Sequence, residues 1–178
     1  MQISLDGFVA GPNGEGDWIF ASGPDPVGFN KIIEIAESCD TLLLGRKMAA
    51  DFIEHWEDAA SADSESPMKE LGRQIVQMRK IVFSRTQKEI AGKNVEMENG
   101  DLATVVNTLK KQTGKDILVY GGASFVSSLI SQNLIDEYLF ITCPIALGSG
   151  LTIFKEKKLL KLDSSTSFKN GKVLNRYL

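Results

Sequence analysis

The stretch Ile117–Cys143, ILVYGGASFVSSLISQNLIDEYLFITC, decides the fold because it holds two apolar runs separated by a helical pattern. Ile117–Tyr120 and Glu137–Cys143 have the β-branched and aromatic content of buried strands, whereas Ala123–Ser131 has the apolar spacing of a helix. A strand, a helix and a second strand in this order form a crossover unit whose two strands run parallel. The sequence therefore predicts an α/β fold.

The chain before this stretch repeats the same alternation. Its first strand, Gln2–Leu5, leads into a glycine-rich loop over Ala10–Gly28, and Asp25 with Pro26 fits the cap and first turn of the next helix. The further predicted elements are a buried strand over Thr41–Leu44, a helix that follows Gly45-Arg46-Lys47, a strand over Lys80–Ser84, and a helix over Leu102–Leu109 capped by Asp101.

The end of the chain predicts a different kind of strand pairing. Leu159–Phe168 and Lys172–Leu178 flank Asn170-Gly171, a dipeptide that favours a type I′ hairpin turn. We therefore expect a mixed, mostly parallel sheet that ends in an antiparallel C-terminal hairpin.

Composition limits the possible functions. The chain has 178 residues, 43% of them hydrophobic, and a net charge of -3, which predicts one globular domain over residues 1–178 and no nucleic-acid partner. Two separated cysteines and one histidine argue against a zinc site, and the lack of a long apolar run argues against a membrane span. The segment Asp51–Glu65 has six acidic residues and predicts a solvated surface rather than a cation site. We expect a soluble, cytoplasmic protein without a bound metal.

Three strand ends have sequences suited to holding phosphate. They are Gly45-Arg46, Ser84-Arg85-Thr86 and Gly121-Gly122-Ala123-Ser124. Glycine lets the backbone approach an anion, helix N-termini offer free N–H groups, and arginine or hydroxyl groups add charge or hydrogen bonds. Each turn alone is compatible with a purely structural role, but three of them after successive strands favour a dinucleotide site.

The known nucleotide and hydrolase signatures are absent. No GxGxxG follows the first strand, and the chain has no GxxxxGK[ST], so neither a Rossmann domain nor a P-loop fits. The single histidine, His55, lies in the acidic segment without a serine or cysteine motif beside it, which argues against nucleophilic catalysis.

Four segments together resemble the dihydrofolate-reductase-like family, which includes the C-terminal reductase domain of the bifunctional riboflavin-biosynthesis deaminase/reductase. They are ISLDGFVAGPNGEGDW, TLLLGRKM, IVFSRT and ILVYGGASFVSSLISQNLIDEYLFITCPIALGSGLTIF, and they span nearly the whole chain in order. The resemblance implies a three-layer α/β/α sandwich that binds NADPH across its strand ends. It also implies a homodimer and a small-molecule substrate, without the deaminase domain.

The resemblance assigns positions in this sequence to roles. The residues implied for the cofactor are Gly45, Arg46, Lys47, Ser84, Arg85, Thr86, Gly121, Gly122, Ala123 and Ser124. Those implied for the substrate are Trp18, Phe29 and Thr142, with Asp6 and Asp25 as the catalytic carboxyl groups. Asp25 fits a helix cap equally well. Two arginines and no acidic residue in the turns that face the ribose favour NADPH over NADH.

The leading hypothesis is an NADPH-dependent reductase of a small heterocyclic or carbonyl substrate. The substrate would be pterin-like, or a ribosylaminopyrimidine of the type used in riboflavin biosynthesis. Asp6, Asp25 or a bound water would supply the proton. The alternatives are a non-catalytic nucleotide-binding or dimerisation module on the same fold, and an ordinary α/β domain in which the glycines are only structural.

Overall fold

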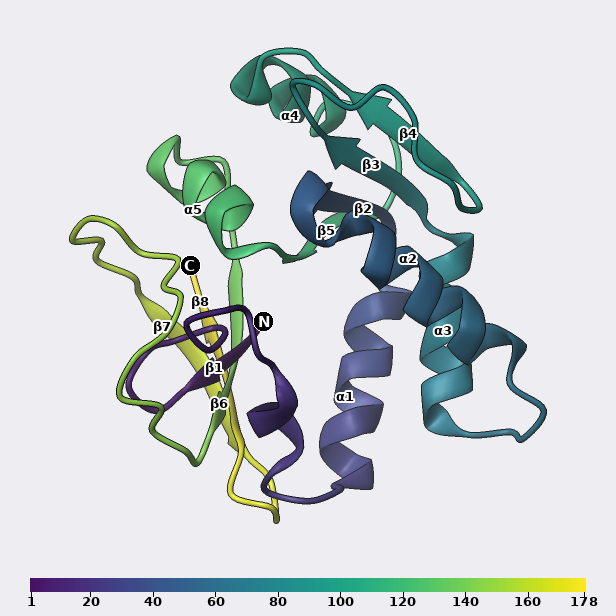
Figure 1. The fold of residues 1–178 in the computed structure, drawn as a ribbon. Helices are drawn as coiled ribbons and strands as arrows, with labels where there is room; N and C mark the ends of the chain where they lie inside the picture. The colour runs from purple at the N-terminus through teal and green to yellow at the C-terminus, as the bar shows by residue number, and fades with distance from the viewer. The chain divides into compact units, whose positions relative to one another are not determined.

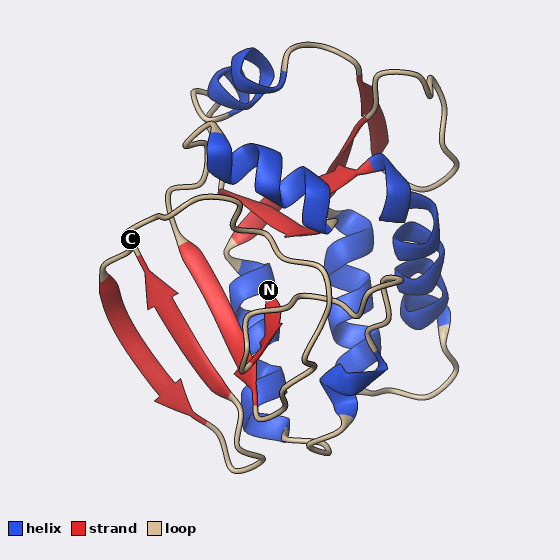
Figure 2. Cartoon of the chain, turned by 60° about the vertical axis from the view of Figure 1, so that its left-hand side comes forward, coloured by secondary structure: helices blue, strands red, loops and turns tan.

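A computed structural model describes all 178 residues and confirms the α/β fold class (Figure 1). The chain forms two compact units. The first unit comprises Met1–Gly28 and Val126–Leu178, and the second comprises Phe29–Phe125. Each unit contains a four-stranded sheet, drawn in red in Figure 2, so the strands predicted from the sequence are divided between two sheets.

The sheet of the second unit is entirely parallel. Its order is β4 (Val95–Glu98), β3 (Arg79–Phe83), β2 (Cys39–Gly45) and β5 (Asp116–Gly121). The inner strand β2 is buried from Thr41 to Gly45, as expected for a parallel strand covered on both faces. The βαβ pattern of the sequence therefore gives the expected parallel pairing.

Four helices belong wholly or mainly to the second unit: α1 (Pro26–Glu37), α2 (Arg46–Ser61), α3 (Pro67–Gln77) and α4 (Leu102–Leu109). Helices α2 and α3 lie side by side (Figure 1). A Cβ atom at Gly72 would come within 2.8 Å of the Ala60 nitrogen, so this glycine permits the close approach of α3 to α2. Buried side chains of both helices, Trp56 and Ile75 among them, pack with Leu42 and Val82 of the sheet.

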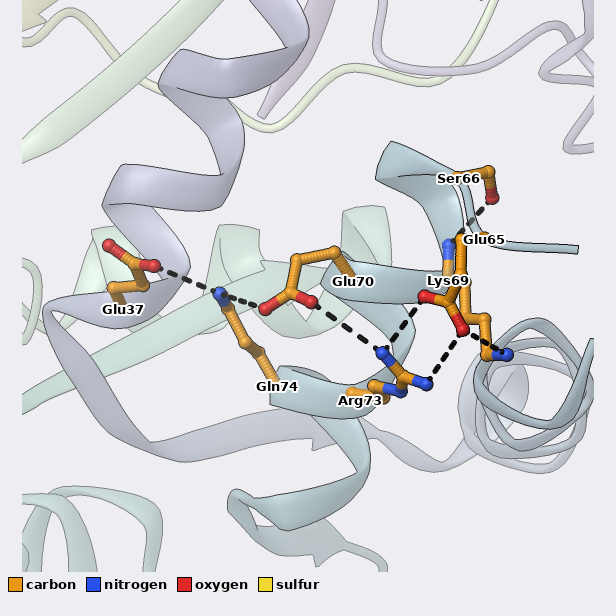
Figure 3. Close-up of polar contacts among 7 residues, drawn as sticks. All are labelled: Glu37, Glu65, Ser66, Lys69, Glu70, Arg73 and Gln74. Carbon is orange, nitrogen blue, oxygen red and sulfur yellow. Dashed lines mark hydrogen bonds and ion pairs between the residues drawn. The ribbon is translucent and has the colours of Figure 1, made fainter.

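Helix α3 and strand β4 are not among the elements that the sequence predicts. Helix α3 begins after Ser66, whose hydroxyl accepts a hydrogen bond from the Lys69 nitrogen at 3.1 Å. Glu65, at the end of the acidic segment, pairs with Lys69 at 2.7 Å and with Arg73 at 3.1 Å (Figure 3). Most of the acidic segment is the exposed face of α2, and α4 begins after Asp101 as predicted.

The sheet of the first unit is mixed. Its order is β1 (Gln2–Ser4), β6 (Tyr138–Cys143), β8 (Val173–Tyr177) and β7 (Leu162–Ser167). Strands β1 and β6 are parallel, while β6 with β8 and β8 with β7 are antiparallel, which confirms the C-terminal hairpin. Helix α5 (Ala123–Ser131) extends into this unit, and a short 3₁₀ helix covers Asp17–Phe20.

The prediction of a type I′ turn in the hairpin is wrong. Gly171 has a φ of +83°, but Asn170 does not have a positive φ, whereas a type I′ turn needs both. The Gly171 nitrogen donates to the Phe168 oxygen at 3.0 Å, and the Phe168 nitrogen donates to the Lys172 oxygen at 2.8 Å. This is a three-residue loop that ends in a left-handed glycine, and the Asn170 nitrogen is directed to Asp25 instead.

Candidate functional site

The three predicted phosphate turns follow three neighbouring strands of the second unit. Strand β2 pairs in parallel with β3 on one side and with β5 on the other, with Gly45 opposite Phe83 and Leu44 opposite Gly121. The carboxyl ends of these strands therefore form one edge, and the turns lie side by side across about 10 Å, the width of two strand spacings. This is the edge at which ligands bind in open α/β sheets.

The first turn joins β2 to α2 without a side-chain cap. Gly45 is the N-cap residue, in an extended conformation, and no side chain accepts from the first N–H groups of the helix. Arg46 and Lys47 are exposed in the first turn of α2, and neither forms an ion pair within the protein. This helix end therefore offers unpaired N–H groups beside two free cations.

The second turn is held by Ser84. Its side chain is buried, and its hydroxyl oxygen accepts hydrogen bonds from the Thr86 nitrogen at 3.2 Å and the Gln87 nitrogen at 2.8 Å. The hydroxyl of Ser84 thus orders the turn, while Arg85 and Thr86 are exposed beside it. Of the three residues predicted here, Arg85 and Thr86 have side chains available to a ligand, and Ser84 positions them.

The third turn needs glycine at Gly122. Its φ is +90°, which strains any L-residue with a side chain. Gly121 before it is buried, and a Cβ there would come within 3.2 Å of the Met48 sulfur. Ala123 begins α5 at once, so the first N–H groups of a second helix lie at the same sheet edge. Ser124 lies exposed in the first turn of that helix.

Phe125 packs between the turns and is a residue that the sequence analysis missed. A Cβ at Gly45 would come within 2.6 Å of the Phe125 Cβ, and the Phe125 ring lies 5.2 Å from that of Phe83. One side chain from α5 therefore contacts the ends of both β2 and β3. A phenylalanine three residues after a double glycine is the only local signal, and it does not distinguish this contact from ordinary core packing.

In the first unit, Asp6 is a fully engaged carboxylate. It accepts hydrogen bonds from the Ser4 hydroxyl at 2.6 Å, from the Gly148 nitrogen at 2.7 Å and from the Leu147 nitrogen at 3.0 Å. These bonds, that of Ser4 first, lower the pKa of Asp6 to about 2. Asp6 is therefore ionised at neutral pH and joins the end of β1 to the glycine-rich turn after β6.

Asp25 has the geometry of a helix cap. One carboxylate oxygen accepts from the Val27 and Gly28 nitrogens, both at 3.0 Å, and the other accepts from the Asn170 nitrogen at 3.3 Å. These bonds, led by that of Gly28, hold the pKa of Asp25 below its usual value. Of the two roles that the sequence leaves open, the contacts favour the cap.

The three residues predicted for the substrate occupy different surroundings. Trp18 is 7% exposed and donates its ring N–H to the Glu15 oxygen at 3.1 Å, so it orders the loop around the 3₁₀ helix. Phe29 belongs to the second unit and packs against its core. Thr142 pairs with Ile3 across β6 and β1 and lines a cavity of the first unit, together with Gly7.

The structure also bears on metals and membranes. It contains no cluster of three or more His, Cys, Asp or Glu side chains that could hold a metal ion. Every helix is too short or too polar to cross a lipid bilayer.

Comparisons with known proteins show which family and fold the chain shares. The chain is 36% identical to the uncharacterised protein YyaP of Bacillus subtilis over 176 residues, which is 97% of this chain and 89% of that protein. A crystal structure of a Shewanella sp. PV-4 protein, described as a riboflavin biosynthesis protein, superposes with a TM-score of 0.72 at 24% identity, over 99% of this chain and 94% of the other.

Two further solved structures share the fold. The diaminohydroxyphosphoribosylaminopyrimidine deaminase/5-amino-6-(5-phosphoribosylamino)uracil reductase of Thermotoga maritima has a TM-score of 0.67 at 17% identity, and the match covers 99% of this chain and 54% of that one. Dihydrofolate reductase from Enterococcus faecalis, solved with NADP(H), has a TM-score of 0.60 at 14% identity, over 99% of this chain and 91% of the other.

The family comparison is decisive because it covers both units. The family model of the RibD C-terminal domain matches residues 1–174. The dihydrofolate-reductase-like α/β fold is the one expected from the sequence. This chain belongs to the RibD C-terminal domain family, a family of the reductase type.

Proposed function

We propose that this protein is an NADPH-dependent reductase that transfers a hydride to a small heterocyclic or carbonyl substrate. The observation that carries the proposal is the register of β2 with β3 and β5, because it brings the turns at Gly45, Ser84 and Gly122 to one sheet edge. A dinucleotide with two phosphates and a ribose phosphate needs several anion-binding groups spread over such a distance.

The residues at this edge fit a dinucleotide. Gly122 has the positive φ that lets a backbone N–H face an anion, and the α2 N-terminus at Gly45 is not capped by any side chain. No acidic residue lies in the three turns to repel a phosphate. In the proposal, Gly121 to Ser124 hold the pyrophosphate, and Gly45 to Lys47 lie beside the phosphates at the α2 N-terminus.

The two arginines set the proposed preference for NADPH. Arg46 and Arg85 follow adjacent strands and are both exposed, so their guanidinium groups are available for a 2′-phosphate. A preference for NADH would instead call for a carboxylate that receives the ribose 2′-hydroxyl. When bound, the nicotinamide cofactor supplies the hydride; the protein supplies binding, orientation and exclusion of water.

The proposed substrate is a pterin-like or ribosylaminopyrimidine-like heterocycle, as the reductase named in the Thermotoga maritima structure acts on an aminouracil. Asp6 and Asp25, whose pKa values are both lowered, are poor proton donors at neutral pH. We therefore assign the proton to a bound water. Asp6 then orders the turn at Gly148, Asp25 caps α1, and Trp18 orders the loop between them.

Titration with NADPH and NADH, followed by cofactor fluorescence, tests the proposal. We expect NADPH to bind in the micromolar range and more tightly than NADH, and we expect Arg46→Gln or Arg85→Gln to weaken NADPH about tenfold. Arg73→Gln is the matched control, because this exposed arginine pairs with Glu65 and lies on α3. Equal affinities for the two cofactors would remove the role of the arginines, and no binding of either would remove the proposal.

Turnover separates the reductase from a non-catalytic module on the same fold. We expect oxidation of NADPH with at least one member of a panel of pterins, ribityl-pyrimidines, quinones and aldehydes. Tight NADPH binding without turnover on any of them would favour the non-catalytic nucleotide-binding module.

We further propose that both units act as one domain in a cytoplasmic homodimer. The family match, which spans both units, supports the single domain. Light scattering coupled to gel filtration would measure the mass in solution, and a mass of 19.5 kDa would contradict the dimer.

A further inference from the structure

The first unit contains a cavity whose lining includes no residue of the three predicted phosphate turns. It has a volume of about 320 Å³ and is bounded by β1, β6, β8 and the segment 151–160. Residues opposite one another in the sheet point to the same face, so the Ile3–Thr142 and Phe140–Asn175 pairs place their side chains on the cavity face. Ser4, one position further along β1, also lines the cavity, whereas its partner Cys143 on β6 does not.

The apolar part of the cavity is aromatic. Phe140 lines it, with the Phe154 ring 6.0 Å and the Tyr177 ring 6.1 Å from the Phe140 ring. Phe154 stands nearly at right angles to Phe140, at 72°, and Tyr177 is tilted by 54°. Such an arrangement offers ring faces and edges to a flat aromatic ligand.

The polar part of the cavity consists of groups that can donate hydrogen bonds. The Thr142 hydroxyl has no hydrogen-bond partner in the protein, and the Asn175 amide uses only its oxygen, which accepts from the Ser165 hydroxyl at 2.7 Å. The Lys158 ammonium donates to the Asn133 amide oxygen at 2.7 Å and has no carboxylate partner. No acidic side chain lines the cavity.

These groups select one class of ligand. An ammonium without a carboxylate partner, a free amide N–H and a hydroxyl favour an anion, because each can donate to it and no acidic side chain lines the cavity. The aromatic walls favour a ring, and the volume is at the lower end of the range for small-molecule sites. We propose that this cavity binds a small aromatic carboxylate, with its ring between Phe140, Phe154 and Tyr177 and its carboxylate at Lys158. This site goes beyond the proposed reductase function.

Calorimetric titration with 2-naphthoate and with its neutral amide, 2-naphthamide, tests the site on the full-length protein. We expect saturable binding of 2-naphthoate that weakens about tenfold in Lys158→Met, while binding of the neutral amide changes little. Lys155→Met is the matched control, because Lys155 lies on the same segment but does not line the cavity. Thr142→Val, which preserves the shape of the side chain, should weaken the binding of 2-naphthoate a few-fold.

The same titration with saturating NADPH present separates this site from the nucleotide edge. We expect 2-naphthoate to bind equally well with and without NADPH, because none of the cavity residues lies in the three turns. Loss of 2-naphthoate binding with NADPH present, equal losses in Lys158→Met and Lys155→Met, or no saturable binding at all would each overturn the inference. Failure to bind 2-naphthoate together with a dimer that Tyr177→Ser dissociates would make this face an interface between two copies.

Discussion

Gly122 joins a backbone requirement to the proposed cofactor site. Its φ of +90° costs an alanine about 1–2 kcal/mol, while the space is adequate, since an added Cβ would lie 3.5 Å from the Met48 sulfur. We expect Gly122→Ala to lower the free energy of unfolding by this amount, measured by urea denaturation, and to weaken the binding of NADPH. Gly14→Ala is the control, because Gly14 has a φ of +98° in open space. Equal NADPH affinity in the two variants would contradict the role of Gly122.

The role of Asp25 as a helix cap can be tested separately from a role as proton donor. Asparagine keeps an oxygen that accepts from the Val27 and Gly28 nitrogens, whereas alanine removes it. We expect Asp25→Ala to lower the free energy of unfolding and Asp25→Asn to lower it much less, with turnover of NADPH unchanged in the asparagine variant. A loss of turnover in a stable Asp25→Asn protein would restore this carboxyl group as the proton donor.

Because of Asp6, the stability of the folded protein should depend on pH in the acid range. Its pKa falls from 3.8, the ordinary value for an aspartate, to about 2 in the folded chain, so the folded state favours the charged form. The stabilisation is present above about pH 4 and is lost as the pH falls towards 2. We expect the melting temperature of Asp6→Asn to lie below that of the unchanged protein at pH 6 and the gap to narrow by pH 2.5. A gap that stays constant over this range would show that the charge of Asp6 is not involved.

At the scale of elements, helix α3 ends on a buried lysine. The Lys80 side chain is fully buried, and its ammonium donates to the carbonyl oxygens of Ile75, Val76 and Met78, each at 2.9 Å. Lys80 thus satisfies carbonyl groups that a helix end leaves unpaired. We expect Lys80→Met to lower the free energy of unfolding by about 1–3 kcal/mol. Lys115→Met, which removes one exposed bond to the Glu37 oxygen, should cost much less.

Because of the same lysine, the stability of the folded protein should also depend on pH in the alkaline range. Burial lowers the pKa of Lys80 from 10.5 to about 8, so between these values the unfolded chain binds more protons than the folded one. The contribution of Lys80 to stability should therefore rise between pH 8 and pH 10.5. We expect the stability gap between the unchanged protein and Lys80→Met to widen over this window in urea denaturation. A gap that shrinks would mean that the ammonium, and not the neutral amine, is favoured by folding.

Elements were predictable where their signals are local. The α4 helix has a capping aspartate and a regular apolar spacing, and the central strand β2 is a continuous apolar run. Strand β4, with the sequence VEME, has only four residues and exists through its pairing with β3. The hairpin turn differs from the predicted type because the Asn170 nitrogen bonds to Asp25, 145 residues away in sequence. A contact between residues so far apart cannot be predicted from a short stretch of sequence.

At the scale of the whole molecule, the convergence of the three strand-end turns was predictable, and the surroundings of the residues predicted for the substrate were not. Parallel strands bring their carboxyl ends together, so glycines and arginines after three strands had to meet once β3, β2 and β5 were neighbours. The division into two sheets and the packing of Phe125 depend on tertiary contacts that no local pattern specifies. Asp6 and Asp25 were assigned by resemblance, and each carboxylate also accepts a hydrogen bond from a backbone group distant in sequence, Gly148 for Asp6 and Asn170 for Asp25.

The two units should respond separately to the two proposed ligands. All ten residues assigned to the cofactor lie in the second unit, and all the cavity residues lie in the first. Amide hydrogen exchange should therefore slow with NADPH in the peptides that cover Gly45, Ser84 and Gly122, and with 2-naphthoate in the peptide that covers 151–160. Any ligand that binds only the folded protein slows exchange at amides that exchange through global unfolding, in both units alike. The informative amides are therefore those that exchange through local opening. Protection by NADPH in 151–160 but not at Gly122 would place the nucleotide in the first unit and remove the proposed edge.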